Sequence, residues 1–99
     1  MTVPTQRLEG VARDLLFFRT PSLWPTWPHL SVVRHKPGDE MDLGVIYDFA
    51  HTSGRTGYGS TVFLCNFWFL PDTEEGLLAL PREVFDTFDE MAAAGWAVD

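Results

Sequence analysis

Cysteine and basic side chains are scarce in this chain of 99 residues, and long hydrophobic runs are missing from it. The one cysteine, Cys65, cannot form a disulfide within the chain, which favours a reducing compartment. No apolar stretch reaches the roughly 20 residues that span a bilayer, and the N-terminus lacks the basic-then-apolar pattern of a signal peptide. We therefore expect a cytoplasmic protein that does not contact a membrane.

Basic side chains number seven against fourteen acidic ones, which gives a net charge of −7. This charge opposes contact with the phosphates of nucleic acids, so no nucleic-acid partner is expected. It is compatible with a role as an acidic inhibitor of a basic protein. The simpler interpretation is that acidity keeps a small domain soluble.

Recognisable catalytic and cofactor-binding motifs are also missing. The glycine-rich loop 52–60 carries Arg55, but it leads toward a predicted strand and not into a helix whose N-terminus could bind phosphate. Asp48, His51 and Ser53 are near in sequence, yet their spacing does not indicate a catalytic triad. The histidines lack the close paired spacing of metal ligands. We expect no cofactor, no metal and no catalytic residue, and we favour a non-catalytic protein over an enzyme.

The densest apolar stretch runs from Ser60 to Pro71 and is predicted to be the central strand, because it is rich in aromatic and β-branched residues. Alternation along this strand places Phe63 and Phe67 on one face and Asn66 and Trp68 on the other. Both faces are apolar apart from Asn66, so both must be covered.

The remaining pattern predicts a single α+β domain, residues 1–99, in the order α-β-β-β-α. Apolar residues at helical spacing indicate a first helix from about Pro4 to Arg19 and a second one between Pro81 and Gly95. A short helical turn is expected before the second helix, after Asp72 or Thr73. Two further strands are predicted over Leu30–Lys36 and Leu43–His51.

These strands form a predicted three-stranded antiparallel sheet with two helices on one face, and a fourth short strand at Trp96–Val98 is compatible with the sequence. The assumed hairpin register places Trp68 across from Gly44 and Asp48 diagonal to Asn66. It assigns the helices to the face of Val45 and Phe63, and leaves the opposite face without a helix.

Polar groups on that second face are the candidate site, because buried polar groups must be paired or hydrated. Asp48 and Asn66 are its centre, and a segment that carries two tryptophans among prolines is expected to close over it as a lid. The alternatives are a satisfied buried network or a polar patch in a subunit interface. The candidate residues are Asp48, Asn66, Trp68, Arg34, His35, Trp24, Trp27, Arg55 and Tyr58.

Three functions remain open at this point. The first is a non-catalytic interaction or regulatory module that forms a homodimer through the second face of the sheet, or binds another protein there. The second is a small-molecule-binding protein or enzyme with a pocket around Asp48 and Asn66. The third is an acidic inhibitor of a basic protein.

Overall fold

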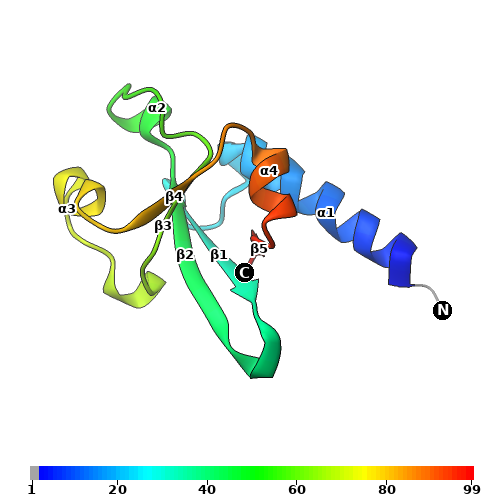
Figure 1. The fold of residues 1–99 in the computed structure, drawn as a ribbon. Helices are drawn as coiled ribbons and strands as arrows, with labels where there is room; N and C mark the ends of the chain where they lie inside the picture. The colour runs from blue at the N-terminus through cyan, green and yellow to red at the C-terminus, as the bar shows by residue number, and fades with distance from the viewer. Residues whose placement is uncertain (1–2) are drawn as a thin grey trace.

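The protein is built around one antiparallel β-sheet, which a computed structural model describes for residues 3–99, with side chains from Gly10 onward (Figure 1). Across the sheet the described strands follow the order β4-β3-β2-β1-β5. They are β1 (His29–His35), β2 (Met41–Tyr47), β3 (Thr61–Phe63), β4 (Arg82–Val84) and β5 (Ala97–Val98). The predicted α+β class and antiparallel sheet are confirmed, but the described sheet has five strands in place of three or four.

The hairpin of β1 and β2 is the longest paired unit, and it runs in register from His29 opposite Tyr47 to His35 opposite Met41. A 3₁₀ turn, η2 (Pro37–Asp39), joins the two strands. The strand predicted over Leu30–Lys36 is therefore confirmed. At the far edge of β1, β5 pairs with Val32 and Val33, so the short C-terminal strand is confirmed as well.

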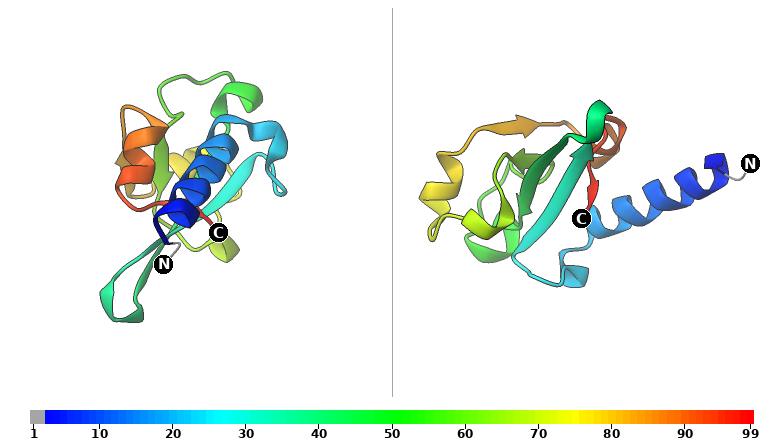
Figure 2. Two further views of the ribbon diagram at one scale, coloured as in Figure 1. Left: turned by 90° about the vertical axis from the view of Figure 1, so that its right-hand side faces the viewer. Right: turned by 90° about the horizontal axis from the view of Figure 1, so that it is seen from below.

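Helices cover both faces of the sheet, with α3 on one side of the strands and α1 and α4 on the other (Figures 1 and 2). The long helix α1 (Val3–Arg19) confirms the predicted first helix, and its N-terminal half extends beyond the sheet. The short helices are α2 (Phe49–Thr52), α3 (Glu74–Leu78) and α4 (Phe88–Ala93). None of the helices in the described part of the chain is both long and apolar enough to cross a membrane.

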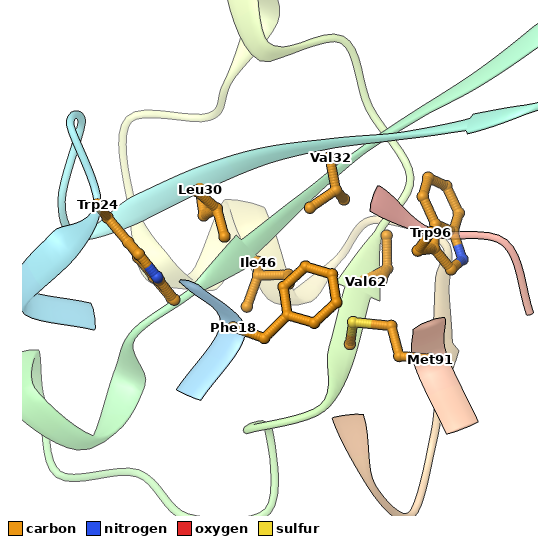
Figure 3. Close-up of a cluster of buried hydrophobic side chains, with 8 residues drawn as sticks. All are labelled: Phe18, Trp24, Leu30, Val32, Ile46, Val62, Met91 and Trp96. Atoms are coloured by element: carbon orange, nitrogen blue, oxygen red, sulfur yellow. The ribbon is translucent and has the colours of Figure 1, made fainter. Parts of the chain in front are cut away.

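The main core lies between the sheet and the pair α1 and α4 (Figure 3). Its strand residues come from the face of Ile46 and Val62, so the prediction that the helices pack on the face of Val45 and Phe63 is wrong. Both faces of the sheet carry buried apolar side chains, such as Val32 and Val33, so alternation along the strands could not show which face the helices cover. The buried members of this first cluster are Phe18, Trp24, Leu30, Val32, Ile46, Val62, Met91 and Trp96.

A second, smaller cluster fills the opposite face, where Phe49, Phe63 and Leu77 are buried. Leu77 belongs to α3, which begins where the Thr73 hydroxyl accepts a hydrogen bond of 3.0 Å from the backbone N–H of Gly76. The helical turn predicted after Asp72 or Thr73 is therefore confirmed. The face that was expected to lack a helix is covered by α1 and α4, while the face expected to receive both helices is covered by α3.

Two predicted strands end earlier than expected. Only Thr61–Phe63 of the stretch from Ser60 to Pro71 pairs in the sheet, with Phe63 opposite Val45. This pairing shifts the assumed register by four residues and removes Trp68 from Gly44. After β3 the chain leaves the sheet, and Asn66 starts a 3₁₀ turn, η3 (Phe67–Phe69), by accepting a hydrogen bond of 3.0 Å from the backbone N–H of Trp68.

The other early end is at Tyr47, the last residue of β2. The next residue, Asp48, is the N-cap of α2, and its side chain accepts a hydrogen bond from the backbone N–H of His51. The predicted strand Leu43–His51 therefore turns into a helix at its last residues. A short polar side chain that can satisfy helical N–H groups favours this change.

The last helix is shorter than predicted, because residues 82–84 form β4 at the edge of the sheet. Thr87 caps α4 through a hydrogen bond of 3.1 Å from the backbone N–H of Glu90. The helix ends at Gly95, whose φ of +102° is easy for glycine alone. As predicted, the chain then folds back, and Trp96 joins Met91 in the core.

Candidate functional site

The two residues at the centre of the predicted site, Asp48 and Asn66, occupy different surroundings. Asp48 caps α2 and is buried, whereas Asn66 caps η3 and is partly exposed. Asn66 lines a surface depression together with Arg34 and Leu43, and Asp48 lines hollows at the other end of β2. The side chains that surround Asp48 therefore define the candidate site.

Arg34 has a structural role at a distance from Asp48. Its guanidinium lies 2.7 Å from carboxylate oxygens of both Asp42 and Glu83 and 4.5 Å from the centre of the Trp96 ring. The hydrogen bonds to Glu83 and Asp42 raise the pKa of Arg34, and they lower the pKa of each carboxyl group in return. His35 is exposed at the end of β1 and joins neither group.

The two tryptophans of the proline-rich segment do not form a lid over Asn66. Trp24 is buried in the first cluster, where its indole N–H donates a hydrogen bond of 2.6 Å to the carbonyl oxygen of Phe17. Trp27 is partly exposed, and its indole N–H donates a hydrogen bond of 2.8 Å to Asp48 Oδ2. The segment thus packs beside the end of β2 and anchors Asp48.

A hollow of about 360 Å³ lies at this end of the sheet, where the two hydrophobic clusters approach each other. We call it the aromatic hollow. Among the predicted site residues, Trp24, Asp48, Arg55 and Tyr58 line it together. Its aromatic walls are Phe18, Trp24, Tyr47, Phe49, Tyr58 and Phe88, and its charged or titratable lining residues are Arg19, Asp48, His51 and Arg55.

Asp48 holds a hydrogen-bonded group at the side of the aromatic hollow. Nδ1 of His51 lies 2.9 Å from Asp48 Oδ2 and 3.0 Å from Asp48 Oδ1, so the carboxylate fixes the orientation of the exposed imidazole. Nε2 of His51 is then directed away from Asp48. A neighbouring depression, lined by Pro21, Trp27, Asp48 and His51 among others, continues the aromatic hollow around this group.

This arrangement resembles the base and orienting acid of a catalytic triad in one respect, the contact between imidazole and carboxylate. Among the described residues, however, Asp48 is the only hydrogen-bond partner of the His51 ring, and Ser53 is not one. Near this group, the side chain of Ser53 and hydrogen bonds from Tyr47 and Thr52 lower the pKa of the carboxyl group of Glu74. Within the described residues, the pair of His51 and Asp48 therefore has no hydroxyl nucleophile hydrogen-bonded to it.

Most residues that line the aromatic hollow were not among the predicted site residues, and His51, Arg19 and Phe88 are three of them. His51 could have been found, because the spacing from Asp48 to His51 is that of an N-cap and the third helical residue, which brings the two close. Arg19 and Phe88 come from distant elements, α1 and α4. No local pattern indicates that they meet, so only the packing of the helices could reveal them.

A second surface feature is the exposed aromatic pair of η3. Trp68 is 86% exposed and Phe69 is 79% exposed, although neighbouring Phe67 packs edge-on to the ring of His29. Cys65 lies just before this turn, partly buried, and burial raises the pKa of its thiol. The pair Trp68 and Phe69 is called the η3 surface below.

Comparisons with protein-family models, with curated proteins and with solved structures find no match for this chain. The candidate site therefore rests on its own geometry.

Proposed function

We propose that the protein binds a small molecule in the aromatic hollow. The observation that carries this proposal is the hollow itself, whose volume of about 360 Å³ and aromatic walls are typical of ligand pockets. Such pockets span about 300 to 1,000 Å³ and combine apolar walls with a few polar groups that orient the ligand. Asp48 and His51 supply those groups on one side.

The walls of the aromatic hollow are held in place before any ligand arrives. Phe18, Trp24 and Phe49 are buried members of the two clusters, and Tyr58 packs against the ring of Phe49 at a centroid distance of 4.9 Å. Side chains that are already ordered lose little entropy on binding. Preorganisation of this kind supports a ligand site.

Binding can be tested with indole as a probe, by following backbone amide shifts in NMR spectra during a titration. We expect saturable shifts at residues that line the aromatic hollow. Ala50→Trp should abolish them, because Ala50 lines the hollow and the larger ring occupies its space. Ala93→Trp is the matched control, since Ala93 is exposed on α4 outside the hollow. Equal binding by Ala50→Trp would exclude the hollow as the site.

A second candidate function is self-association through the η3 surface, which is favoured by the exposure of Trp68 and Phe69. The homodimer predicted from the sequence used the face of Ile46 and Val62, and that face is buried under α1 and α4. The η3 surface is the exposed alternative. Inhibition of a basic protein stays a prediction from the net charge of −7.

Light scattering over a range of protein concentrations tests the dimer. A dimer through the η3 surface should dissociate in Trp68→Asp, and added salt should strengthen it by screening the repulsion between two acidic copies. A monomer at high micromolar concentration, with or without salt, would rule out this function for Trp68.

A further inference from the structure

Basic side chains gather at the aromatic hollow although the chain as a whole is acidic. Arg19, His51 and Arg55 all line it, and Asp48 is the one acidic group among its described lining residues. The chain has seven basic side chains against fourteen acidic ones, so a random distribution of charges over the surface would not be expected to group basic side chains in this way. Among the lining residues alone, two arginines thus face one carboxylate, which is the reverse of the acidic excess of the whole chain.

Hydrogen-bond donors around Asp48 compensate most of its negative charge. Its carboxylate accepts hydrogen bonds from the indole N–H of Trp27 and the backbone N–H of His51, and it also contacts the imidazole of His51. Hydrogen-bond donors around a buried carboxylate stabilise its charge and reduce its effect on a nearby ligand. Asp48 therefore orients His51 and is a poor partner for a cationic ligand.

Arg19 and Arg55 line the hollow from different elements, and each forms an ion pair with an acidic partner outside the lining. Arg19 forms an ion pair of 2.7 Å with Asp89, in which the two side chains are 51% and 64% exposed. Arg55 lies 3.3 Å from Glu74 and 3.7 Å from Glu75. Exposed ion pairs contribute little to stability, so an anion in the hollow can replace Asp89 at low cost.

We infer that the ligand is a small aromatic carboxylate, and this inference rests on the proposed function. Its ring packs between the aromatic walls of the hollow, where stacking and edge contacts are available. Its carboxylate faces the guanidinium groups of Arg19 and Arg55, which bind carboxylates through paired N–H donors. Nε2 of His51 provides a further polar contact at the same rim.

The experiment compares three probes of one shape and different charge by isothermal titration calorimetry at low ionic strength. Indole-3-acetate carries the carboxylate, indole-3-acetamide is its neutral counterpart, and tryptamine is the cation. We expect the acid to bind about tenfold more tightly than the amide, with tryptamine weakest, and the advantage to shrink as salt is added.

Variants connect this preference to the two arginines. Arg19→Gln and Arg55→Gln should each weaken binding of the acid more than binding of the amide, and so reduce the advantage of the acid. Arg13→Gln is the matched control, because it removes the same charge from an exposed residue outside the aromatic hollow. An equal loss in Arg13→Gln would show that net charge alone is responsible and would overturn the inference.

The outcomes separate the inference from the proposed function. Binding of the amide or of tryptamine as tight as that of the acid overturns the carboxylate ligand but leaves a ligand site in the hollow. Failure of all three probes to bind counts against both. A preference for the acid that is lost in Arg19→Gln or Arg55→Gln, and kept in Arg13→Gln, supports the inference.

Discussion

Gly44 determines where Trp96 lies. A Cβ atom at this position would overlap Cγ1 of Val62, and it would also touch the ring of Trp96 at 3.2 Å. The space left by the missing side chain lets the indole of Trp96 pack close to β2. The sequence pattern assigned Trp68 to this place, but the aromatic cover comes from the C-terminal end of the chain.

Gly44→Ala should lower the free energy of unfolding by about 1 to 3 kcal/mol, because an extra methyl group overpacks a site that is already filled. Chemical denaturation measures this change. Gly59→Ala is the control, since a Cβ at Gly59 meets no atom within 4 Å, and we expect it to stay within about 0.5 kcal/mol of the wild type. A neutral Gly44→Ala would contradict the packing of Trp96 described above.

At the scale of elements, Arg34 connects strands that are distant in sequence. It belongs to β1 and contacts Asp42 of β2, Glu83 of β4 and the ring of Trp96, which precedes β5. Hydrogen bonds from Arg34 hold the pKa of Asp42 and of Glu83 below their ordinary values. These carboxylates therefore add stability above their unfolded pKa values, and the contribution is lost as the pH falls through the lower folded values.

Between about pH 5 and pH 3, Arg34→Met should lose less stability than the wild type does. The reason is that the pKa values of the two carboxyl groups in the folded state are then closer to their unfolded values. Urea denaturation at a series of pH values measures the slope. Arg19→Met is the control, since its partner Asp89 lies on the exposed surface. An unchanged slope in Arg34→Met would show that the network does not control the acid response.

The turn η3 shows how an element can differ from its local pattern. The aromatic run Phe67–Phe69 has high β-propensity. Asn66 nevertheless caps the turn by accepting a hydrogen bond from the backbone N–H of Trp68, and no strand in the described chain pairs with this run. Trp68 consequently remains exposed, whereas a central strand would bury it.

Trp68→Ala should change the free energy of unfolding by less than about 0.5 kcal/mol, as expected for an exposed side chain. Trp96→Ala should cost about 3 to 5 kcal/mol, because it leaves a large cavity in the first cluster. Thermal or chemical unfolding of the two variants distinguishes the cases. A large loss in Trp68→Ala would favour the strand predicted over Ser60–Pro71.

At the scale of the whole molecule, two hydrophobic clusters lie on opposite faces of one sheet and approach each other at the aromatic hollow. Phe18 and Trp24 line the hollow from the first cluster. Phe49 lines it from the second cluster, and Tyr58 packs against that cluster. A ligand in the hollow would touch both. The position of the candidate site therefore depends on the two clusters being formed together.

Leu77→Ala tests whether the clusters unfold as one unit. It should lower the stability by about 2 to 5 kcal/mol through the cavity left in the second cluster. Because Trp24 and Trp96 lie in the first cluster, their fluorescence should report the same lowered midpoint as circular dichroism if unfolding is all-or-none. A fluorescence midpoint that stays at the wild-type value would show that the clusters unfold separately.

Local interactions are enough to predict four features: α1, the strand β1, the capped turn at Thr73 and the end of α4 before Gly95. Each depends on residues a few positions apart, through periodicity, a capping side chain or a left-handed glycine. The same local reasoning identified Asp48 as a candidate site residue, but it predicted Asn66 as the neighbour of Asp48.

Three features depend on long-range contacts: the face of the sheet that receives the helices, the end of the strand after Ser60, and the meeting of Arg19 and Phe88 with Asp48 at the aromatic hollow. The end of the strand follows from β4, which pairs with residues 61–63, and the other two features follow from the way α1 and α4 pack on the sheet. Register couples segments far apart in the chain, and a shift of the pairing changes every cross-strand neighbour. The fold class was therefore accessible from local pattern, whereas the site depended on long-range packing.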